Sequence, residues 1–336
     1  MTRPDERRWR EERAVLNERR AALGERASGL YPDAVRVGST SLLCRPEWIP
    51  AEPVPLARVA VRWTENAVPP VVTGAQARLP EGYGSYSQAM GALARPTVFE
   101  DRPAYRLLAA GLRGDDPALD YAEGHYFAGV DVGEAVAHEL AAEVAGLPLR
   151  AAVGDPCDLP RRVALTAVTT VTIRRRARDV VLHWRDPAKV AHAGGLYQVM
   201  PVGVFQPAVE DDPGELDLWR CMVREYHEEF LGGSEEYGAG FAYDTWPFFR
   251  RMSGDGVRAY CLGLGVDPLT MAVDLLTAVV VDDDVFADLF GARVDVNAEG
   301  RVMTAPFDGR PRHPMQPAGA AALELAWRHR AALLVQ

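Results

Sequence analysis

The sequence predicts a mixed α+β protein. Residues 163–174 are rich in valine and threonine, which favour β-strands, and further strand-like segments precede and follow one acidic helix over residues 216–231. A length of 336 residues suggests two compact units, or one unit with large additions. We therefore expect a domain with a mixed sheet over residues 151–336, a smaller α+β domain over residues 31–150, and a charged helix over residues 1–30.

The segments of the first half define the smaller unit. Residues 4–28 are predicted to form one charged helix, whose sparse apolar stripe would pack on its own domain or, in a homodimer, on the partner subunit. Short strands are predicted over residues 35–43 and 57–63, on either side of a proline-rich turn. Residues 102–112 and 132–145 are predicted to be helices.

The second half places strands around the acidic helix. After residues 163–174, strands are predicted over residues 180–184 and 197–205, the latter interrupted by Pro201 and Gly203. A glycine pair, Gly232-Gly233, ends the acidic helix. The later segments are predicted as strands over residues 259–265, 273–281 and 302–306, with residues 272–276 also suited to a helix, and as a last helix over residues 318–334.

Composition and charge exclude several classes of function. Hydrophobic residues make up 48 % of the chain and charged residues 25 %, as in ordinary soluble globular proteins. The formal net charge of -10 repels phosphate backbones, so we expect no nonspecific nucleic-acid binding. The four cysteines lack zinc-ligand spacing, and no apolar run is long enough to span a bilayer. We expect a cytoplasmic protein with reduced thiols and no membrane partner.

The acidic helix carries three closely spaced carboxylates. Each helical residue turns by about 100°, so Glu225, Glu228 and Glu229 fall within a sector of roughly 100°. Such a group is either a solvated charged face or a cation site. Mg²⁺ (or Mn²⁺) binds carboxylate oxygens while keeping waters and positions for phosphate oxygens, and a metal-bound water can attack phosphorus. Arg224 can pair with one carboxylate and fix its orientation.

The string Arg224-Glu225-Tyr226-His227-Glu228-Glu229-Phe230-Leu231-Gly232 resembles the second half of the Nudix family signature, G-x5-E-x7-R-E-U-x-E-E-x-G-U, in which U is aliphatic. Tyr226 replaces the aliphatic residue, and the glycine comes one position late. Upstream, Gly203 resembles the glycine turn that opens the signature. The loop from Gly203 to Arg224 is several residues too long, and Glu215, the nearest upstream glutamate, is one position out of register. The resemblance covers roughly residues 150–335 and extends to Nudix-like proteins of actinobacteria.

The resemblance implies a fold and an activity. The fold is a Nudix-like mixed-sheet α/β/α sandwich, here with an additional N-terminal α+β domain. The activity is Mg²⁺-dependent hydrolysis of a small molecule that contains a diphosphate, of the nucleoside or prenyl diphosphate type. Glu225, Glu228 and Glu229 would bind the metal ion, one of them would also act as a base, and Arg224 would orient the cluster.

Two alternatives to hydrolysis stay open. Because the upstream half of the signature is altered, the domain would also suit a catalytically inert ligand-binding or regulatory protein, or a different diphosphate reaction in a biosynthetic pathway. Around the signature, we expect Gly203, Tyr197 and Phe205 to contact the substrate, although aromatic residues at this density also suit a hydrophobic core.

Other acidic groups are weaker candidates for metal binding. Nudix-like enzymes often add a later acidic ligand, and Asp267 and Asp274 both suit that role. Residues 282–284 are three consecutive aspartates, which suit a loop at the end of a strand better than a metal site. Four residues of one predicted helix could form either a metal site or a solvated helix face, and the solvated face is the better interpretation. They are Glu134, His138, Glu139 and Glu143.

Overall fold

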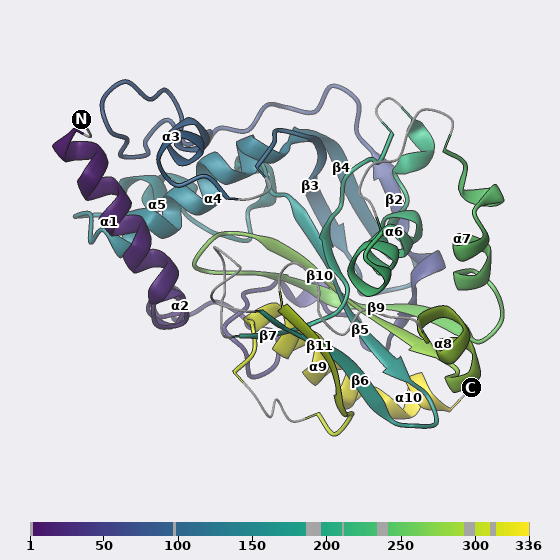
Figure 1. Cartoon of the computed structure of the whole chain (residues 1–336). Helices are drawn as coiled ribbons and strands as arrows, with labels where there is room; N and C mark the ends of the chain where they lie inside the picture. The colour runs from purple at the N-terminus through teal and green to yellow at the C-terminus, as the bar shows by residue number, and fades with distance from the viewer. Residues whose placement is uncertain are drawn as a thin grey trace.

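The computed structural model describes residues 3–96, 99–185, 196–209, 212–233, 241–291, 300–309 and 314–335. Within them the chain forms an eight-stranded mixed sheet, a three-stranded sheet and ten α-helices (Figure 1). The expected mixed α+β class is therefore confirmed.

The eight-stranded sheet has the order β1-β9-β10-β5-β6-β11, with β7 added to β6 and β8 added to β5. Its centre is the parallel pair of β5 and β10, and the other pairs are antiparallel. Apart from one irregularity in the pairing of β9 with β10, the register is regular. The strands are β1 (Val54–Pro55), β5 (Thr166–Arg174), β6 (Asp179–Arg185), β7 (Tyr197–Val199), β8 (Val202–Val204), β9 (Val257–Val266), β10 (Val273–Val281) and β11 (Gly300–Pro306).

Helices cover both faces of this sheet. On one face, Tyr226 of α6 contacts Thr172 of β5, with 2.6 Å between the two hydroxyl oxygens, and the Tyr226 ring stacks on Phe290 of α8. On the other face, Leu325 of α9 lies against Gly263 of β9. The first face carries α6 (Leu218–Leu231), α7 (Pro247–Met252) and α8 (Asp283–Phe290), which lie to the right of the sheet in Figure 1. The other face carries α9 (Pro317–Arg328), which is followed by α10 (Arg330–Leu334).

The three-stranded sheet has the order β2-β4-β3 and lies beside the N-terminal helices. Arg13 of α1 donates to Tyr86 of α3 and to Glu134 of α4, both at 2.8 Å, and this buried network joins three helices. The elements are β2 (Ala60–Trp63), β3 (Pro103–Gly111), β4 (Ala118–His125), α1 (Pro4–Glu18), α2 (Arg20–Gly29), α3 (Tyr86–Leu93), α4 (Tyr126–Ala141) and α5 (Pro148–Val153).

Contacts cross the expected domain boundary near residue 150 at several points. Strand β1 belongs to the first half of the sequence but pairs with β9, through Val54 and Cys261. The Tyr105 and Tyr121 rings of the small sheet pack on Phe205, with centroids 4.8 Å and 5.1 Å away. One continuous hydrophobic core therefore includes residues of both halves.

Several predicted elements are wrong or shifted. Residues 102–112 form β3, not a helix, because pairing with β4 overrides their helix-favouring alanines and leucines. Residues 35–43 form only isolated bridges, and β4 was not predicted. The N-terminal helix breaks at Arg19 and the last helix at His329, while α4 begins at Tyr126. The strands predicted in the second half, including residues 272–276, are confirmed.

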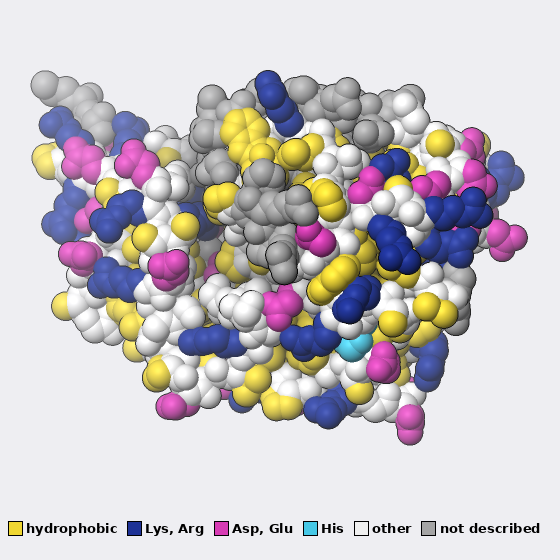
Figure 2. Space-filling model, turned by 90° about the horizontal axis from the view of Figure 1, so that it is seen from below, with side chains coloured by type: hydrophobic (Ala, Val, Ile, Leu, Met, Phe, Trp, Pro, Cys, Tyr) yellow, Lys and Arg dark blue, Asp and Glu magenta, His cyan; other side chains and the backbone are white. Residues whose placement is uncertain are grey.

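The surface mixes charges of both signs. On the face seen in Figure 2, Lys and Arg side chains are interspersed with Asp and Glu side chains, and hydrophobic side chains lie between them in small groups. The acidic side chains therefore do not form one continuous negative patch on this face. Within the described residues, no helix has both the length and the apolar character needed to cross a bilayer.

Candidate functional site

Helix α6 is fixed at both ends by its own sequence. Asp217 caps the first turn, because its Oδ1 accepts hydrogen bonds from the backbone N–H groups of Trp219 (2.8 Å) and Arg220 (3.0 Å). Gly232 ends the helix in the left-handed conformation with φ +69°. The apolar side of the helix is buried on the sheet, so the three glutamates are held on a rigid element.

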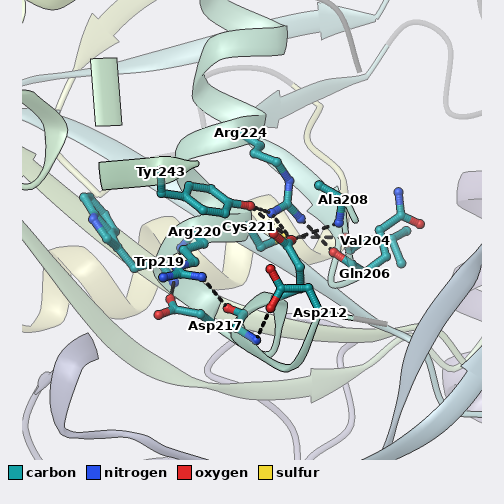
Figure 3. Close-up of polar contacts among 12 residues, drawn as sticks. Val204, Gln206, Ala208, Asp212, Asp217, Trp219, Arg220, Cys221, Arg224 and Tyr243 are labelled. Carbon is teal, nitrogen blue, oxygen red and sulfur yellow. Dashed lines mark hydrogen bonds and ion pairs between the residues drawn. The ribbon is translucent and has the colours of Figure 1, made fainter. Parts of the chain in front are cut away.

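Arg224, in the middle of this helix, lies at the centre of a buried polar network. Its Nη1 donates to Oε2 of Glu215 at 2.8 Å and to the hydroxyl of Tyr243, and its Nη2 donates to the carbonyl of Gln206 at 2.7 Å. Figure 3 shows the Tyr243 hydroxyl pointing at the guanidinium. Burial disfavours the charged guanidinium, but Cys221, Tyr243 and Glu215 outweigh it and raise the pKa of Arg224.

The pairing of Glu215 with Arg224 accounts for the irregular upstream half of the motif. Glu215 ends a short 3-10 turn, Pro213–Glu215, which Asp212 caps through the backbone N–H of Gly214. That turn brings the Glu215 side chain, only 1 % exposed, to the arginine. The long loop changes the number of residues between the upstream glutamate and Arg224, but the buried Glu215 carboxylate still contacts Arg224.

Two of the three glutamates lie against the short strand β8. A Cβ atom added to Gly203 would lie 1.8 Å from the carboxyl carbon of Glu225, so this carboxylate occupies the space that the glycine leaves. Oε1 of Glu229 accepts a hydrogen bond from the backbone N–H of Val202 at 3.2 Å. Glu225, Glu228 and Glu229 are all half-buried. The structure therefore places Glu225 and Glu229 together at Val202 and Gly203.

The donor set suits Mg²⁺ in chemical type, because the ion prefers carboxylate oxygens and tolerates a site built from few protein ligands and several waters. The Gly203 position is consistent with this, since it admits a carboxylate where any side chain would collide. In the part of the chain that the structure describes, however, no three His, Cys, Asp or Glu side chains form a ready metal-binding group. Glu225, Glu228 and Glu229 would be the residues to hold an ion here.

The residues expected to bind substrate lie in different surroundings. Gly203 faces Glu225, as described. Phe205 is 0 % exposed and packs between Tyr105 and Tyr121, so its ring belongs to the core that joins the two sheets. Tyr197 is half-buried on β7, and its backbone pairs with the segment Pro314–Gln316. The structure brings together Gly203 and the glutamates but places Phe205 away from solvent.

The acidic cluster on α4 is structural, and the solvated face predicted for it is wrong, because Glu134, His138 and Glu139 are buried. Glu134 forms ion pairs with Arg13 and Arg20, and Glu139 accepts hydrogen bonds from the first backbone N–H groups of α5. Burial lowers the pKa of His138 to about 4, and its Nδ1 lies 2.9 Å from the Tyr86 hydroxyl. Glu143 lies in an exposed turn.

The aspartates of residues 282–284 also have a structural role at the start of α8. Asp282 forms ion pairs with Arg175 and Arg258. Asp283 accepts hydrogen bonds from the backbone N–H groups of Arg176 and Ala177. These contacts join the start of α8 to the turn between β5 and β6 and to β9.

A cavity of about 820 Å³ lies on the other face of the large sheet, and sequence reasoning did not predict it. Its walls are formed by α2 and α4, the starts of β5 and β10, the strand β8, and the first turn of α9. Val202 and Val204 line it, whereas Gly203 between them faces Glu225, because successive residues of a strand point to opposite faces. Strand β8 thus separates the cavity from the glutamates.

Both late aspartates line this cavity rather than the face of α6. Asp267 accepts hydrogen bonds from Leu269 and Thr270 and so closes the turn before β10. Asp274 is 8 % exposed and accepts a hydrogen bond from Thr169 at 2.8 Å. Burial, assisted by repulsion from Asp267, raises the pKa of Asp274 to about 7 despite that hydrogen bond.

Comparison of the chain with models of known protein families gives no match, and comparison with curated proteins gives none either. The likeness to the Nudix signature therefore rests on the residues of α6 and β8 and on their arrangement.

Proposed function

We propose that the chain is a Mg²⁺-dependent hydrolase of a diphosphate-containing small molecule, built on a Nudix-like α/β/α sandwich with additional N-terminal elements. The order of elements supports this proposal. A hairpin of β5 and β6, the short strands β7 and β8, the acidic helix α6, and then β10 parallel to β5 follow one another. Helices α6 and α9 lie on opposite faces, which makes three layers.

The observation that carries the proposal is the placement of two acidic side chains on β8. The Glu225 carboxylate fills the space beside Gly203, and Glu229 is held by the backbone N–H of Val202. A bound Mg²⁺ would supply a water nucleophile of lowered pKa and would neutralise charge on the diphosphate. Of the chain's own residues, the glutamates would hold the ion, and Arg224, fixed by Glu215, would anchor the first turns of α6.

The test is phosphate or monophosphate release from a panel of nucleoside and prenyl diphosphates, with Mg²⁺, with Mn²⁺ and with EDTA. We expect metal-dependent turnover that the Glu229→Gln variant loses. The control is Glu11→Gln, which changes an exposed glutamate of α1. Equal turnover by wild type and Glu229→Gln, or turnover in EDTA, would sink the proposal.

A second candidate is a ligand-binding or regulatory protein that does not hydrolyse diphosphates. It is favoured by the 820 Å³ cavity, because β8 separates this cavity from the Glu225 carboxylate. Thermal-shift measurements on the wild-type chain distinguish the two functions. Stabilisation by a ligand without added metal and without turnover favours binding, whereas stabilisation that requires Mg²⁺ favours the hydrolase.

A further inference from the structure

Among the described residues less than 2 % exposed, Arg162 has the largest side chain, and its charge is poorly compensated. It is 1 % exposed and lines the 820 Å³ cavity. Its Nη2 donates to the carbonyl of Met271 at 2.7 Å, whereas Nη1 has no hydrogen-bond partner among the described residues. Within those residues no carboxylate lies within ion-pair distance of it. A buried cation in this state costs several kcal/mol unless something pairs with it.

A nearby buried arginine, Arg150, uses both of its terminal nitrogens as donors, although its Nε also has no partner among the described residues. Arg150 is 5 % exposed and donates to three oxygens, the carbonyls of Pro268 and Leu269 and the hydroxyl of Tyr31. Arg150 does not line the cavity, whereas Arg162 does. Of these two arginines, Arg162 is the one that borders a volume in which a ligand has room.

Other groups add to the positive character of the cavity. Arg36 also lines it, donates only to the carbonyls of Ser28 and Tyr31, and leaves its Nη1 without a partner among the described residues. The first turn of α9 lines it as well, and helix N-termini attract anions.

The acidic groups of the cavity are largely engaged. Glu134 is paired with Arg13 and Arg20, and Asp267 closes its own turn. Asp274 has a raised pKa because it is buried, so its carboxyl is partly neutral near neutral pH and can then donate a hydrogen bond. Glu25 is the one exposed carboxylate of the lining.

We propose that this cavity binds a small organic anion, with a carboxylate or phosphate group on Arg162 and an apolar body against Leu165, Val202 and Val204. The volume of about 820 Å³ suits a molecule of cofactor or metabolite size. Guanidinium groups favour carboxylate and phosphate oxygens because their planar donors match two oxygens at once. The site is separate from the glutamates of α6 and does not depend on hydrolysis.

The experiment measures binding to the whole chain by calorimetry and thermal shift, without metal, using benzoate, phenyl phosphate, inorganic phosphate and the neutral benzamide. We expect saturable binding of benzoate or phenyl phosphate at millimolar concentration, tighter than that of inorganic phosphate or benzamide. Arg162→Met should weaken it about 10- to 100-fold, the range expected for loss of a charged hydrogen bond. Arg113→Met, which changes an exposed arginine, should leave it unchanged.

Two further variants keep the test decisive if Arg162→Met does not fold. Arg162→Lys keeps the charge but loses the two-pronged geometry and should weaken binding. Ala21→Trp adds bulk from the exposed surface of α2 into the cavity without touching the core and should block it. A cavity that holds only water would show no saturable binding of either organic anion, and that result overturns the proposal. Undiminished binding in the Arg162 variants, or equal binding of benzamide, overturns it too.

Discussion

Arg224 and Arg162 are both almost fully buried, at 4 % and 1 % exposure, but they lie in opposite surroundings on the two faces of the large sheet. Arg224 donates to a carboxylate, a phenol and a carbonyl, and its pKa is raised. Arg162 donates to one carbonyl, and burial lowers its pKa to about 10. Both remain charged at neutral pH. Arg224 finds its hydrogen-bond partners within the protein, whereas we infer that Arg162 takes its anionic partner from a ligand in the cavity.

The charge of Arg224 therefore stabilises the fold, whereas we propose that the charge of Arg162 binds a ligand. A buried ion pair is costly to break, since removing one partner leaves the other charged and unpaired. Arg162 has no carboxylate partner among the described residues, so its removal would leave no buried carboxylate unpaired. The two arginines should therefore respond in opposite ways to the same substitution.

The largest expected effect is on unfolding. Arg224→Met should destabilise the fold by about 3–5 kcal/mol, because Glu215 is left buried without its partner. Arg162→Met should leave the ligand-free protein unchanged or make it more stable. Urea titrations of both variants and the wild type measure the two free energies of unfolding. Similar losses in both would show that Arg162 is as structural as Arg224.

The next effect concerns Asp274 and pH. Its pKa of about 7 in the folded chain exceeds the value of 3.8 expected without burial, so ionisation of Asp274 weakens the fold. Its contribution is fully present below pH 4 and is lost as pH rises through 7, a change of at most about 4 kcal/mol at about 1.4 kcal/mol per pKa unit. Asp274→Asn should remove this dependence, so its stability relative to wild type should rise between pH 4 and pH 8. Parallel pH profiles for the two proteins would contradict the burial of the charge.

The third prediction concerns the other face of β8. Gly203→Ala would place a methyl group on the Glu225 carboxylate, and the flexible carboxylate would have to move. We expect metal-dependent turnover to fall about 100-fold, or roughly 2.7 kcal/mol in the activation barrier, with a smaller change in stability. The control is Gly111→Ala, whose new methyl group meets no atom within 4 Å. Turnover that survives Gly203→Ala would place the chemistry away from Glu225.

The smallest effect is at the start of α6. Asp217→Ala removes the cap that holds the N–H groups of Trp219 and Arg220, and should cost about 1 kcal/mol of stability. Asp217→Asn keeps an oxygen in place and should cost much less. Chemical denaturation of the two variants compares them. Neither change should affect anion binding in the cavity, which lies across the sheet.

The sequence by itself located the strands β5, β6, β9, β10 and β11 and the helix α6, because residue patterns and glycine stops encode these elements locally. It also singled out Arg224 and the glutamates that lie on β8. It failed where local preference and tertiary contacts disagree. The alanines and leucines of residues 103–111 favour a helix, yet pairing with β4 makes them a strand.

Only the tertiary structure decided the pairing and burial of charge. Glu215 reaches Arg224 through a turn whose geometry its spacing did not reveal. Arg162 and Met271 are 109 residues apart in sequence, and no local pattern marks either as part of a cavity. Whether a buried charge has a partner depends on which distant segments the fold brings beside it. For that reason the sequence predicted the acidic helix α6 but did not reveal the role of Arg162 on the opposite face of the sheet.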